Sequence, residues 1–409
     1  MESYRTSGDP LEMAARLKPL VERVMQVSAF TYGRPEQGFA VRFSGRLYGD
    51  SMEAYDQLAA AFQPLDFTPL FRKSADSAAP HEILAAPGVI RPNPSNPLIN
   101  LLMFVLTVLA MLLTGALYDY QGADPAGLGD YLRLLPAGWP FAASLLGILL
   151  AHEFGHYIAA RRSGTAVTLP YFLPFPFSQF GTLGAFIQLK APPKNRRVLL
   201  DIGISGPLAG LAVAVPVLLV GLFLAHVEPI PAVIPAGTGY TFEGNSILYL
   251  GLKFLAFGKL LPAPASFGGE SALWFWIKYL FTGLPAPLGG SDVFLNQVAW
   301  AGWAGLLVTG LNLIPAGQLD GGHALYVLLG KRASRLIPVI LGALILLGFV
   351  WQGWWLWAAI IFFIGRTHAE PLDQITELDP PRRGLAVLAL VIFFLVFTPI
   401  PLRAFFGAK

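Results

Sequence analysis

The chain contains no cysteine among its 409 residues, and charged residues make up only 13% of it. Without cysteine there are no disulfide bonds, no thiolate metal ligands and no cysteine nucleophile. The charged fraction is well below the roughly 25% typical of soluble domains, while 55% of the residues are hydrophobic. A single globular core could not bury so much apolar surface, so the composition predicts a protein embedded in a lipid bilayer.

The chain is also short of features that would indicate other classes of protein. Its net charge is only +3, with a pI near 9.0, and the basic residues stand in short loops between apolar runs. Membrane topology accounts for such loops, so we expect no nucleic-acid partner. Residues 1–30 carry charges throughout and lack the apolar stretch of a signal peptide, so none is expected.

The first 96 residues differ from the rest because they mix charges of both signs and contain no membrane-length apolar run. Their periodicity predicts a small soluble α+β domain on the cytoplasmic side, followed by a stiff proline-rich linker at 91–97. The expected elements are helices over 11–27 and 51–62, with Ser51 as N-cap of the second, and strands over 39–48, 67–72 and 82–86.

Residues 97–409 are expected to form a polytopic α-helical membrane domain of about six to eight spans. The apolar runs predict spans over 98–117, 139–160, 199–225, 293–313 and 384–399, with a short hairpin over 336–350 and 354–364. Residues 245–261 and 271–284 are apolar but interrupted by lysines, so they either lie at the membrane interface or form two poor spans. Both alternatives leave the later topology unchanged.

The basic loops predict the orientation. Arg161 and Arg162, the lysines and arginines of 190–197, the cluster at 331–335 and the pair at 382–383 all fall on one side if the spans alternate. The positive-inside rule makes that side cytoplasmic. Separately, we expect a multi-pass protein of a bacterial inner membrane.

An H-E-x-x-H motif stands at the end of the run 139–160, as His152-Glu153-Phe154-Gly155-His156. On a helix, residues four apart lie on one face, so both imidazoles can bind one zinc ion at about 2.0–2.1 Å. Glu153 can then take a proton from water that the metal activates. A structural cluster without metal is the alternative, but His and Glu inside an apolar run are costly unless they are functional.

The best candidate for a third ligand is Asp320, in the sequence Asn-Leu-Ile-Pro-Ala-Gly-Gln-Leu-Asp-Gly-Gly-His over 312–323. This stretch begins where a predicted span ends toward the cytoplasm. The H-E-x-x-H motif also lies at the cytoplasmic end of its span, so the topology places both motifs at similar depth, near the cytoplasmic side. The metzincin alternative would require a histidine at 162, where the chain has Arg162.

The two motifs together resemble the site-2 protease family of intramembrane zinc metalloproteases. The likeness covers about residues 98–365 and is greatest to bacterial, cyanobacterial and chloroplast members with a soluble N-terminal domain; no segment resembles a PDZ domain. The resemblance implies one Zn²⁺ ion bound by His152, His156 and Asp320, with Glu153 as the catalytic base. It also implies regulated intramembrane proteolysis, in which membrane-spanning protein substrates are cut within the bilayer. The oligomeric state stays open.

Two further polar residues belong to the candidate site. His323 is either an additional ligand or, as we prefer, a residue that orients a ligand or packs the loop. Asn312 either donates a hydrogen bond to a developing oxyanion, holds the Asp320 loop or caps its span. The small residues at Gly206 and Gly210 allow close helix packing, and we assign them no chemical role.

The segment 182–190 has the pattern of a strand, between the motif helix and the next span. Its residues Gly184, Ala185, Phe186 and Ile187 form a possible substrate strand, whose edge could hold an unwound substrate through main-chain hydrogen bonds. The alternative is an interfacial loop that never touches substrate.

Two other functions remain as alternatives. A catalytically silent relative would bind membrane-protein clients without cutting them, but it would be free to lose Glu153, which is present. A cation transporter would carry ionisable residues on several spans, whereas here they are concentrated in two motifs.

Overall fold

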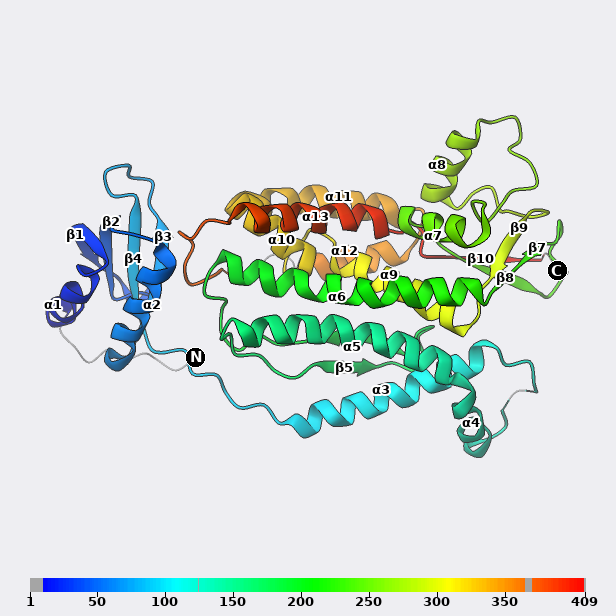
Figure 1. The fold of residues 1–409 in the computed structure, drawn as a ribbon, viewed down its shortest axis with the longest axis horizontal. Helices are drawn as coiled ribbons and strands as arrows, with labels where there is room; N and C mark the ends of the chain where they lie inside the picture. Colours follow the sequence, from blue (N-terminus) through cyan, green and yellow to red (C-terminus); the bar gives the residue numbers. More distant parts are fainter. Residues whose placement is uncertain (1–9, 124, 365–369, 408–409) are drawn as a thin grey trace.

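The computed structural model describes residues 10–123, 125–364 and 370–407. The molecule is elongated, with an α/β region at one end, a bundle of helices in the middle, and short strands and helices at the other end (Figure 1). The expected helical architecture with a small N-terminal α/β region is confirmed. The end of α5 and the starts of α6 and α13 face the α/β region (Figure 1), so the basic loops at these points share one side of the bundle.

The N-terminal region is a four-stranded antiparallel sheet with two helices. Its elements are α1 (Pro10–Val21), β1 (Met25–Tyr32), β2 (Val41–Leu47), α2 (Ser51–Phe62), β3 (Phe67–Lys73) and β4 (His81–Pro87). The strand order is β1-β2-β4-β3. Side chains from both helices and all four strands form a core of their own, with Leu17, Phe43, Leu58 and Ile83 fully or almost fully buried.

Two predictions in this region are wrong in detail. The helix expected over 11–27 ends at Val21, because Met25 already begins β1. Most of β1 is exposed, so it lacks the alternation that identifies a half-buried strand. The N-cap of α2 is Asp50 and not Ser51, since the Asp50 carboxylate accepts hydrogen bonds from the backbone of Met52 and Glu53.

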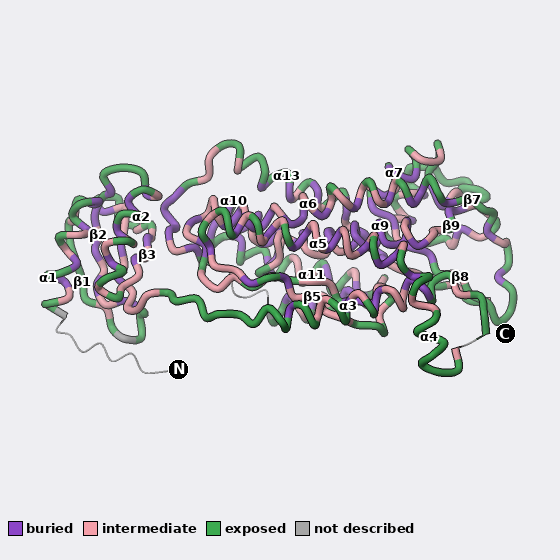
Figure 2. The backbone as a smooth tube through the Cα atoms, turned by 60° about the horizontal axis from the view of Figure 1, so that its bottom comes forward, coloured by how far each residue is buried: buried purple, intermediate pink, exposed green. Residues whose placement is uncertain are grey.

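Three stretches of helix in the described residues are long and apolar enough to cross a membrane. They are α3 (Pro97–Tyr118), the stretch Leu128–Arg162 that contains α4 (Leu128–Leu134) and α5 (Trp139–Arg162), and α6 (Arg196–Phe223). The linker before α3 is exposed along its length, while the inward faces of the bundle are buried (Figure 2). The other helices are shorter, and the count of six to eight spans stays a prediction.

The span expected over 293–313 is wrong in extent. Val293 and Phe294 belong to β9 (Ser291–Phe294), and α9 (Gln297–Asn312) begins only after the cap provided by Asn296. Sixteen residues rise about 24 Å along a helix. Most of the side chains of α9 are buried, because it packs inside the bundle against α5 and α6.

The remaining helices are short. They are α7 (Ile247–Phe257), α8 (Ala272–Thr282), α10 (Asp320–Leu329), α11 (Ile337–Gly348), α12 (Gly353–Ile364) and α13 (Pro380–Val396). The two segments that the sequence left open, α7 and α8, have 11 residues each, or about 16 Å of helix, too little to cross a bilayer core. The predicted hairpin is formed by α11 and α12, which pack against one another.

Short strands pair in three two-stranded sheets. These are β5 (Tyr171–Pro174) with β6 (Thr182–Phe186), β7 (His226–Pro229) with β9, and β8 (Gly239–Glu243) with β10 (Leu402–Phe406). The 3₁₀ segments are Pro35–Gln37, Gln63–Leu65, Leu135–Gly138 and Gly330–Leu336. The predicted strand 182–190 thus ends at Phe186, and it pairs with a partner strand that was not predicted.

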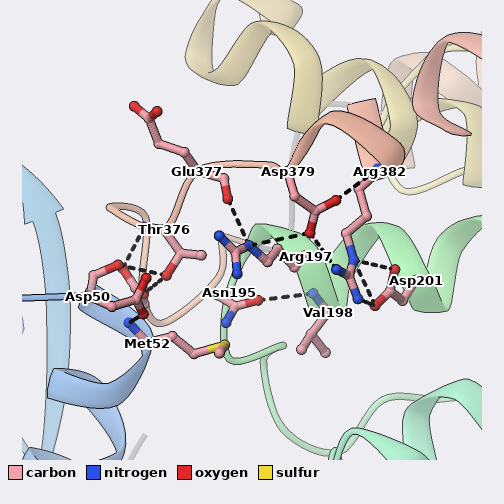
Figure 3. A network of polar contacts seen from close by, with 12 residues as sticks. Asp50, Met52, Asn195, Arg197, Val198, Asp201, Thr376, Glu377, Asp379 and Arg382 are labelled. Atoms are coloured by element: carbon pink, nitrogen blue, oxygen red, sulfur yellow. Dashed lines mark hydrogen bonds and ion pairs between the residues drawn. The ribbon is translucent and has the colours of Figure 1, made fainter. Parts of the chain in front are cut away.

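Residues 371–377 connect the α/β region to the bundle, and we call this segment the strap. The strap lies between β3 and the residues that precede α6, because Asp373 forms parallel bridges with Phe71 on one side and with Asn195 on the other. The hydroxyls of Ser51 and Thr376 are 2.8 Å apart across the same contact. Polar contacts continue from the strap to α6 and α13 (Figure 3). The α/β region is therefore hydrogen-bonded to the bundle through the strap.

Candidate metal centre

The helix α5 carries the first three candidate residues. His152 and His156 are one turn apart and buried, and their Nε2 atoms are separated by 3.1 Å. Glu153, the residue that follows His152 in the helix, is also buried. Because α6 and α9 both pack against α5, this turn of helix faces protein and not lipid.

The fourth residue, Asp320, lies at the end of the loop that follows α9. It is the first residue of α10, and its Oδ2 atom lies 3.4 Å from the Nε2 atom of each histidine. The loop is tight: a Cβ atom on Gly321 would lie 1.9 Å from the carbonyl oxygen of Leu313. The glycine after Asp320 is therefore required for the turn that aims the carboxylate at the histidines.

These three side chains fit a metal ion of the zinc type. Bonds of about 2.05 Å in a tetrahedral site place neighbouring ligand atoms about 3.3 Å apart, and the separations in the structure are 3.1, 3.4 and 3.4 Å. Among the described residues, His152, His156 and Asp320 are the group with ligand atoms close enough to hold a metal. Two imidazoles and one carboxylate also match the donor set of a catalytic zinc site with an open fourth position.

The orientation of His156 is set by α6. Its Nδ1 atom lies 2.7 Å from the carbonyl oxygen of Ile202. A carbonyl only accepts hydrogen bonds, so Nδ1 carries the hydrogen and Nε2 presents its lone pair to the centre. Gly206 lies over the ring, since a Cβ atom there would be 2.0 Å from Nε2 of His156.

Glu153 has the surroundings of a proton acceptor. Its Oε2 atom is buried and makes no hydrogen bond within the described residues. It lines a cavity of about 210 Å³ together with the three candidate ligands. A buried carboxylate oxygen without a donor is costly unless a ligand or water satisfies it, so the open oxygen marks where a reacting group fits.

Every predicted site residue except Gly184 lines this cavity. The side-chain amide of Asn312, the last residue of α9, lies 3.2 Å from Nε2 of His152. His323 follows Asp320 by one turn of α10 and packs against Gly203. Ala185 and its two successors form one wall, while Gly184 precedes them with a φ of +101°, which favours glycine.

The sequence did not reveal how α6 supports the site. Gly203, Gly206 and Gly210 contact His323, His156 and His152 respectively, so each histidine rests on a glycine. The small residues at 206 and 210 were the available signal, but spacing alone does not show which helix packs against them. The contact between the Ile202 carbonyl and His156 could not be predicted from the sequence, because every residue has a backbone carbonyl.

The fold and the site define a class of protein: a helical membrane protein whose bundle encloses a His–His–Asp cluster able to hold a metal ion, beside a buried glutamate. The profile of peptidase family M50 matches residues 140–350, just over half of the chain, and this range contains all three candidate ligands. The chain therefore belongs to peptidase family M50, the site-2 protease family.

Curated plant proteins are similar to this chain. The probable chloroplast zinc metalloprotease EGY1 of Arabidopsis thaliana is 30% identical over 286 residues, covering 69% of this chain and 46% of the relative. For EGY2 of the same plant, which carries the same description, the identity is 32%, with coverages of 66% and 44%. EGY1 of Oryza sativa subsp. japonica is 28% identical, with coverages of 95% and 68%. The chain spans about half the length of the Arabidopsis relatives, and no solved structure matches it significantly.

The comparisons correct the expected location. A bacterial inner membrane was expected, but these relatives are all chloroplast proteins, which points to a plastid membrane. The reason for the error is physical: charge bias in loops reports which side a loop faces, and it carries no information about which membrane is crossed. The site lies toward the side of the α/β region, and that side can no longer be equated with a bacterial cytoplasm.

Proposed function

We propose that this protein is an intramembrane zinc metalloendopeptidase that hydrolyses peptide bonds in transmembrane segments of membrane-anchored proteins. The observation that carries the proposal is the position of Asp320 Oδ2, 3.4 Å from both histidine Nε2 atoms although 164 residues separate it from the nearer histidine. Family membership and the names of the plant relatives support zinc as the metal. We assign the role of ligand to His152, His156 and Asp320.

The remaining residues supply the acid–base chemistry and the positioning. Zinc, when bound, acts as a Lewis acid that polarises the scissile carbonyl and activates water. Glu153 takes the proton from the attacking water and passes it to the leaving amine. Asn312 either donates to the developing oxyanion or holds the ligand loop, and His323 steadies the first turn of α10. The buried surroundings strengthen each of these electrostatic contacts.

Substrate binding is assigned to β6. A transmembrane helix hides its amides, so it must unwind before a peptide bond can reach the centre. The residues Ala185, Phe186 and Ile187 line the metal cavity at the end of β6, and Leu183 and Phe186 are exposed. An extended substrate can add to this edge as a further strand.

The same proposal divides the chain into two parts. Residues 97–409 form the membrane-embedded protease domain, and residues 1–96 form a domain outside the membrane with its linker. We propose that a protease domain with an attached domain outside the membrane serves the regulated release of membrane-anchored proteins. The separate hydrophobic core of the α/β region and the exposed linker support the division.

The first test compares the wild type with Glu153→Gln and Asp320→Ala in detergent, with zinc analysis and cleavage of a transmembrane peptide. Glu153→Gln should retain zinc and lose activity by about 10²–10⁴-fold, the usual contribution of a general base. Asp320→Ala should lose zinc. If Glu153→Gln cuts as fast as the wild type, the mechanism is wrong. If the wild type binds zinc but cuts nothing, a client-binding role replaces the protease.

A second test addresses the substrate strand. Ile187→Pro removes a backbone donor at the end of the strand and should reduce cleavage sharply while zinc stays bound. Ile187→Ala shortens the side chain but retains the N–H group, so it serves as the matched control. Equal rates for the two variants would remove the strand from the proposal.

A further inference from the structure

A second cavity, of about 460 Å³, lies at the end of the bundle that faces away from the α/β region, and we call it the distal cavity. Residues from α3, the β5–β6 turn, β8, β9 and α9 line it, and it shares no lining residue with the metal cavity. Its volume falls within the roughly 300–1,000 Å³ of small-molecule pockets. The proposed peptidase chemistry makes no use of it.

Two buried carboxylates face the distal cavity. Glu243 and Asp292 line it, and their exposed fractions are only 9% and 4%. Lys253 is fully buried behind them, with Nζ at 3.6 Å from Glu243 Oε1 and 4.0 Å from Asp292 Oδ1. Those two oxygens also accept hydrogen bonds from the Tyr249 hydroxyl and the Val293 amide. In the described chain, no hydrogen bond reaches the second oxygen of either carboxylate.

The charges of this cluster do not balance, because two carboxylates share one ammonium group. Excess charge in a buried position is unfavourable unless a counter-charge or a proton compensates it. Burial raises the pKa of Asp292 to about 7, against the opposing effect of Lys253, while Glu243 adds to the rise. A positively charged ligand would supply the missing counter-charge and displace the proton.

The other walls of the distal cavity are aromatic. Tyr118 stacks on Trp300 with ring centroids 5.6 Å apart, and Tyr240 meets Phe294 edge to face at 6.4 Å. Aromatic faces attract ammonium and guanidinium groups, whereas a hard metal ion prefers a shell of six or more oxygen ligands. The chemistry therefore fits an organic cation.

The β5–β6 hairpin joins this cavity to the metal cavity. Ser178 and Gln179 in its turn line the distal cavity, while Ala185 and Ile187 line the metal cavity. A strand rises about 3.3 Å per residue, and only the part from Thr182 onward lies in β6, so the six steps from Gln179 to Ala185 span at most about 20 Å. A substrate extended along the hairpin with its scissile bond at the metal would therefore reach the distal cavity within about six residues.

We propose that the distal cavity binds a cationic group of the substrate, within about six residues to one side of the scissile bond, and so selects which segments are cut. The group is either a lysine or arginine side chain or a free α-amino terminus, since each carries a positively charged nitrogen. This inference rests on the proposed peptidase function, because it concerns the flank of the segment that the metal centre cleaves.

The test uses one transmembrane peptide in four forms, which make two pairs. In the first pair the flanking position carries arginine or the neutral glutamine. In the second pair the peptide begins at that position, with either a free, cationic amino terminus or an acetylated, neutral one. The enzymes are the wild type, Asp292→Asn and Tyr240→Leu, with Glu270→Gln as control. Glu270 is an exposed carboxylate two residues before α8, which lies at the same end of the molecule (Figure 1), and it does not line the cavity. Binding is measured separately in a Glu153→Gln background.

For the wild type we expect kcat/KM for a cationic form to exceed that of its neutral partner by about tenfold or more, as for other buried charge-assisted contacts. Asp292→Asn should abolish the preference, Tyr240→Leu should weaken it several-fold, and Glu270→Gln should leave it intact. The arginine pair and the amino-terminal pair identify which source supplies the cation. Tyr240→Leu leaves the Lys253 cluster intact, so it remains informative if Asp292→Asn does not fold.

The preference should also depend on pH. For the arginine form, which stays charged, it should grow as the pH rises through about 7, because the cavity must release the proton of Asp292 to bind a cation. The titratable and charged groups around Asp292 are Glu228, Glu243, Tyr249, Lys253 and Tyr279.

Equal cleavage and equal binding of cationic and neutral forms would overturn the inference and leave the proposed peptidase function standing. Failure to cut any form would instead refute the proposed function.

Discussion

Arg382 holds the carboxylate of Asp201 with hydrogen bonds of 2.8 and 3.1 Å from Nε and 2.7 Å from Nη2. The contact joins the first turn of α13 to α6 (Figure 3). Asp201 directly precedes Ile202, whose carbonyl orients His156. The last helix of the bundle is therefore fastened to the backbone that positions a candidate metal ligand.

We predict that Arg382→Lys destabilises the protein by about 1 kcal/mol, because lysine cannot make the paired contact of a guanidinium group. Both side chains are about one third exposed, so solvent screening limits the effect. Thermal unfolding in detergent measures it. The matched control is Arg383→Lys, one residue along and exposed. If both variants unfold at the same temperature, the pair contributes nothing to stability.

Gly206→Ala is expected to weaken metal binding by about 10–100-fold, the range seen when the groups that orient metal ligands are altered. The added methyl group would lie 2.0–2.4 Å from three ring atoms of His156, so the ring must move. Zinc affinity is measured by competition with a chelator.

Gly147→Ala is the control for that measurement. Gly147 is in α5, and a Cβ atom there would meet nothing within 4 Å. Unchanged zinc affinity in Gly206→Ala would show that the close approach of α6 does not position the ligand.

These contacts indicate how far the sequence could predict the molecule. Long apolar runs and the spacing of His152 and His156 depend on local periodicity, and both are readable without a fold. The placement of Asp320 followed from alternating spans. The Asp201–Arg382 pair joins segments 181 residues apart, and periodicity shows which face of a helix is buried but not which partner buries it.

Other features were hidden because they depend on tertiary context. The early end of α1 and the late start of α9 are set by strands that are mostly exposed or only four residues long. The sequence of the strap shows no periodicity that predicts its position. Its bridges to Phe71 and Asn195 join it to segments that are distant in the chain and meet only in the folded protein. The distal cavity collects residues from five separate elements, none of which forms a motif.

We predict that Asp373→Ala weakens the attachment of the strap to β3. Asp373 is fully buried, and it accepts hydrogen bonds from the Ile375 amide at 2.7 Å, the Thr376 amide at 3.2 Å and the Thr376 hydroxyl. Removing a buried acceptor typically costs about 1–3 kcal/mol. We expect faster amide exchange in the strap and in β3, measured by mass spectrometry at constant pH.

Glu377→Ala provides the comparison for the strap. Its side chain is 77% exposed, and its ion pair with Lys73 is a surface pair of small energetic value. Exchange in the strap should change little in this variant. If Asp373→Ala exchanges no faster than Glu377→Ala, the buried carboxylate does not hold the strap in place.

The α/β region should lose stability in mild acid because of His81. Burial lowers the pKa of His81 from 6.5, and Lys73 and Arg46 lower it further. Its Nδ1 atom accepts a hydrogen bond from the Leu47 amide at 3.1 Å, which requires the neutral ring. The unfolded chain therefore takes up a proton more readily than the folded one. The stabilisation is complete above pH 6.5 and is lost as the pH falls through the folded-state pKa.

The measurement is the urea concentration at which a protease begins to cleave the α/β region, compared at pH 7.5 and pH 5.5. His81→Asn should reduce the difference between the two pH values, because asparagine can accept the Leu47 hydrogen bond without titrating. His226 is exposed and begins β7, which lies at the other end of the molecule (Figure 1), so His226→Asn should leave the difference unchanged. An acid-induced loss of the same size in His81→Asn would mean that other groups in the region carry the pH dependence.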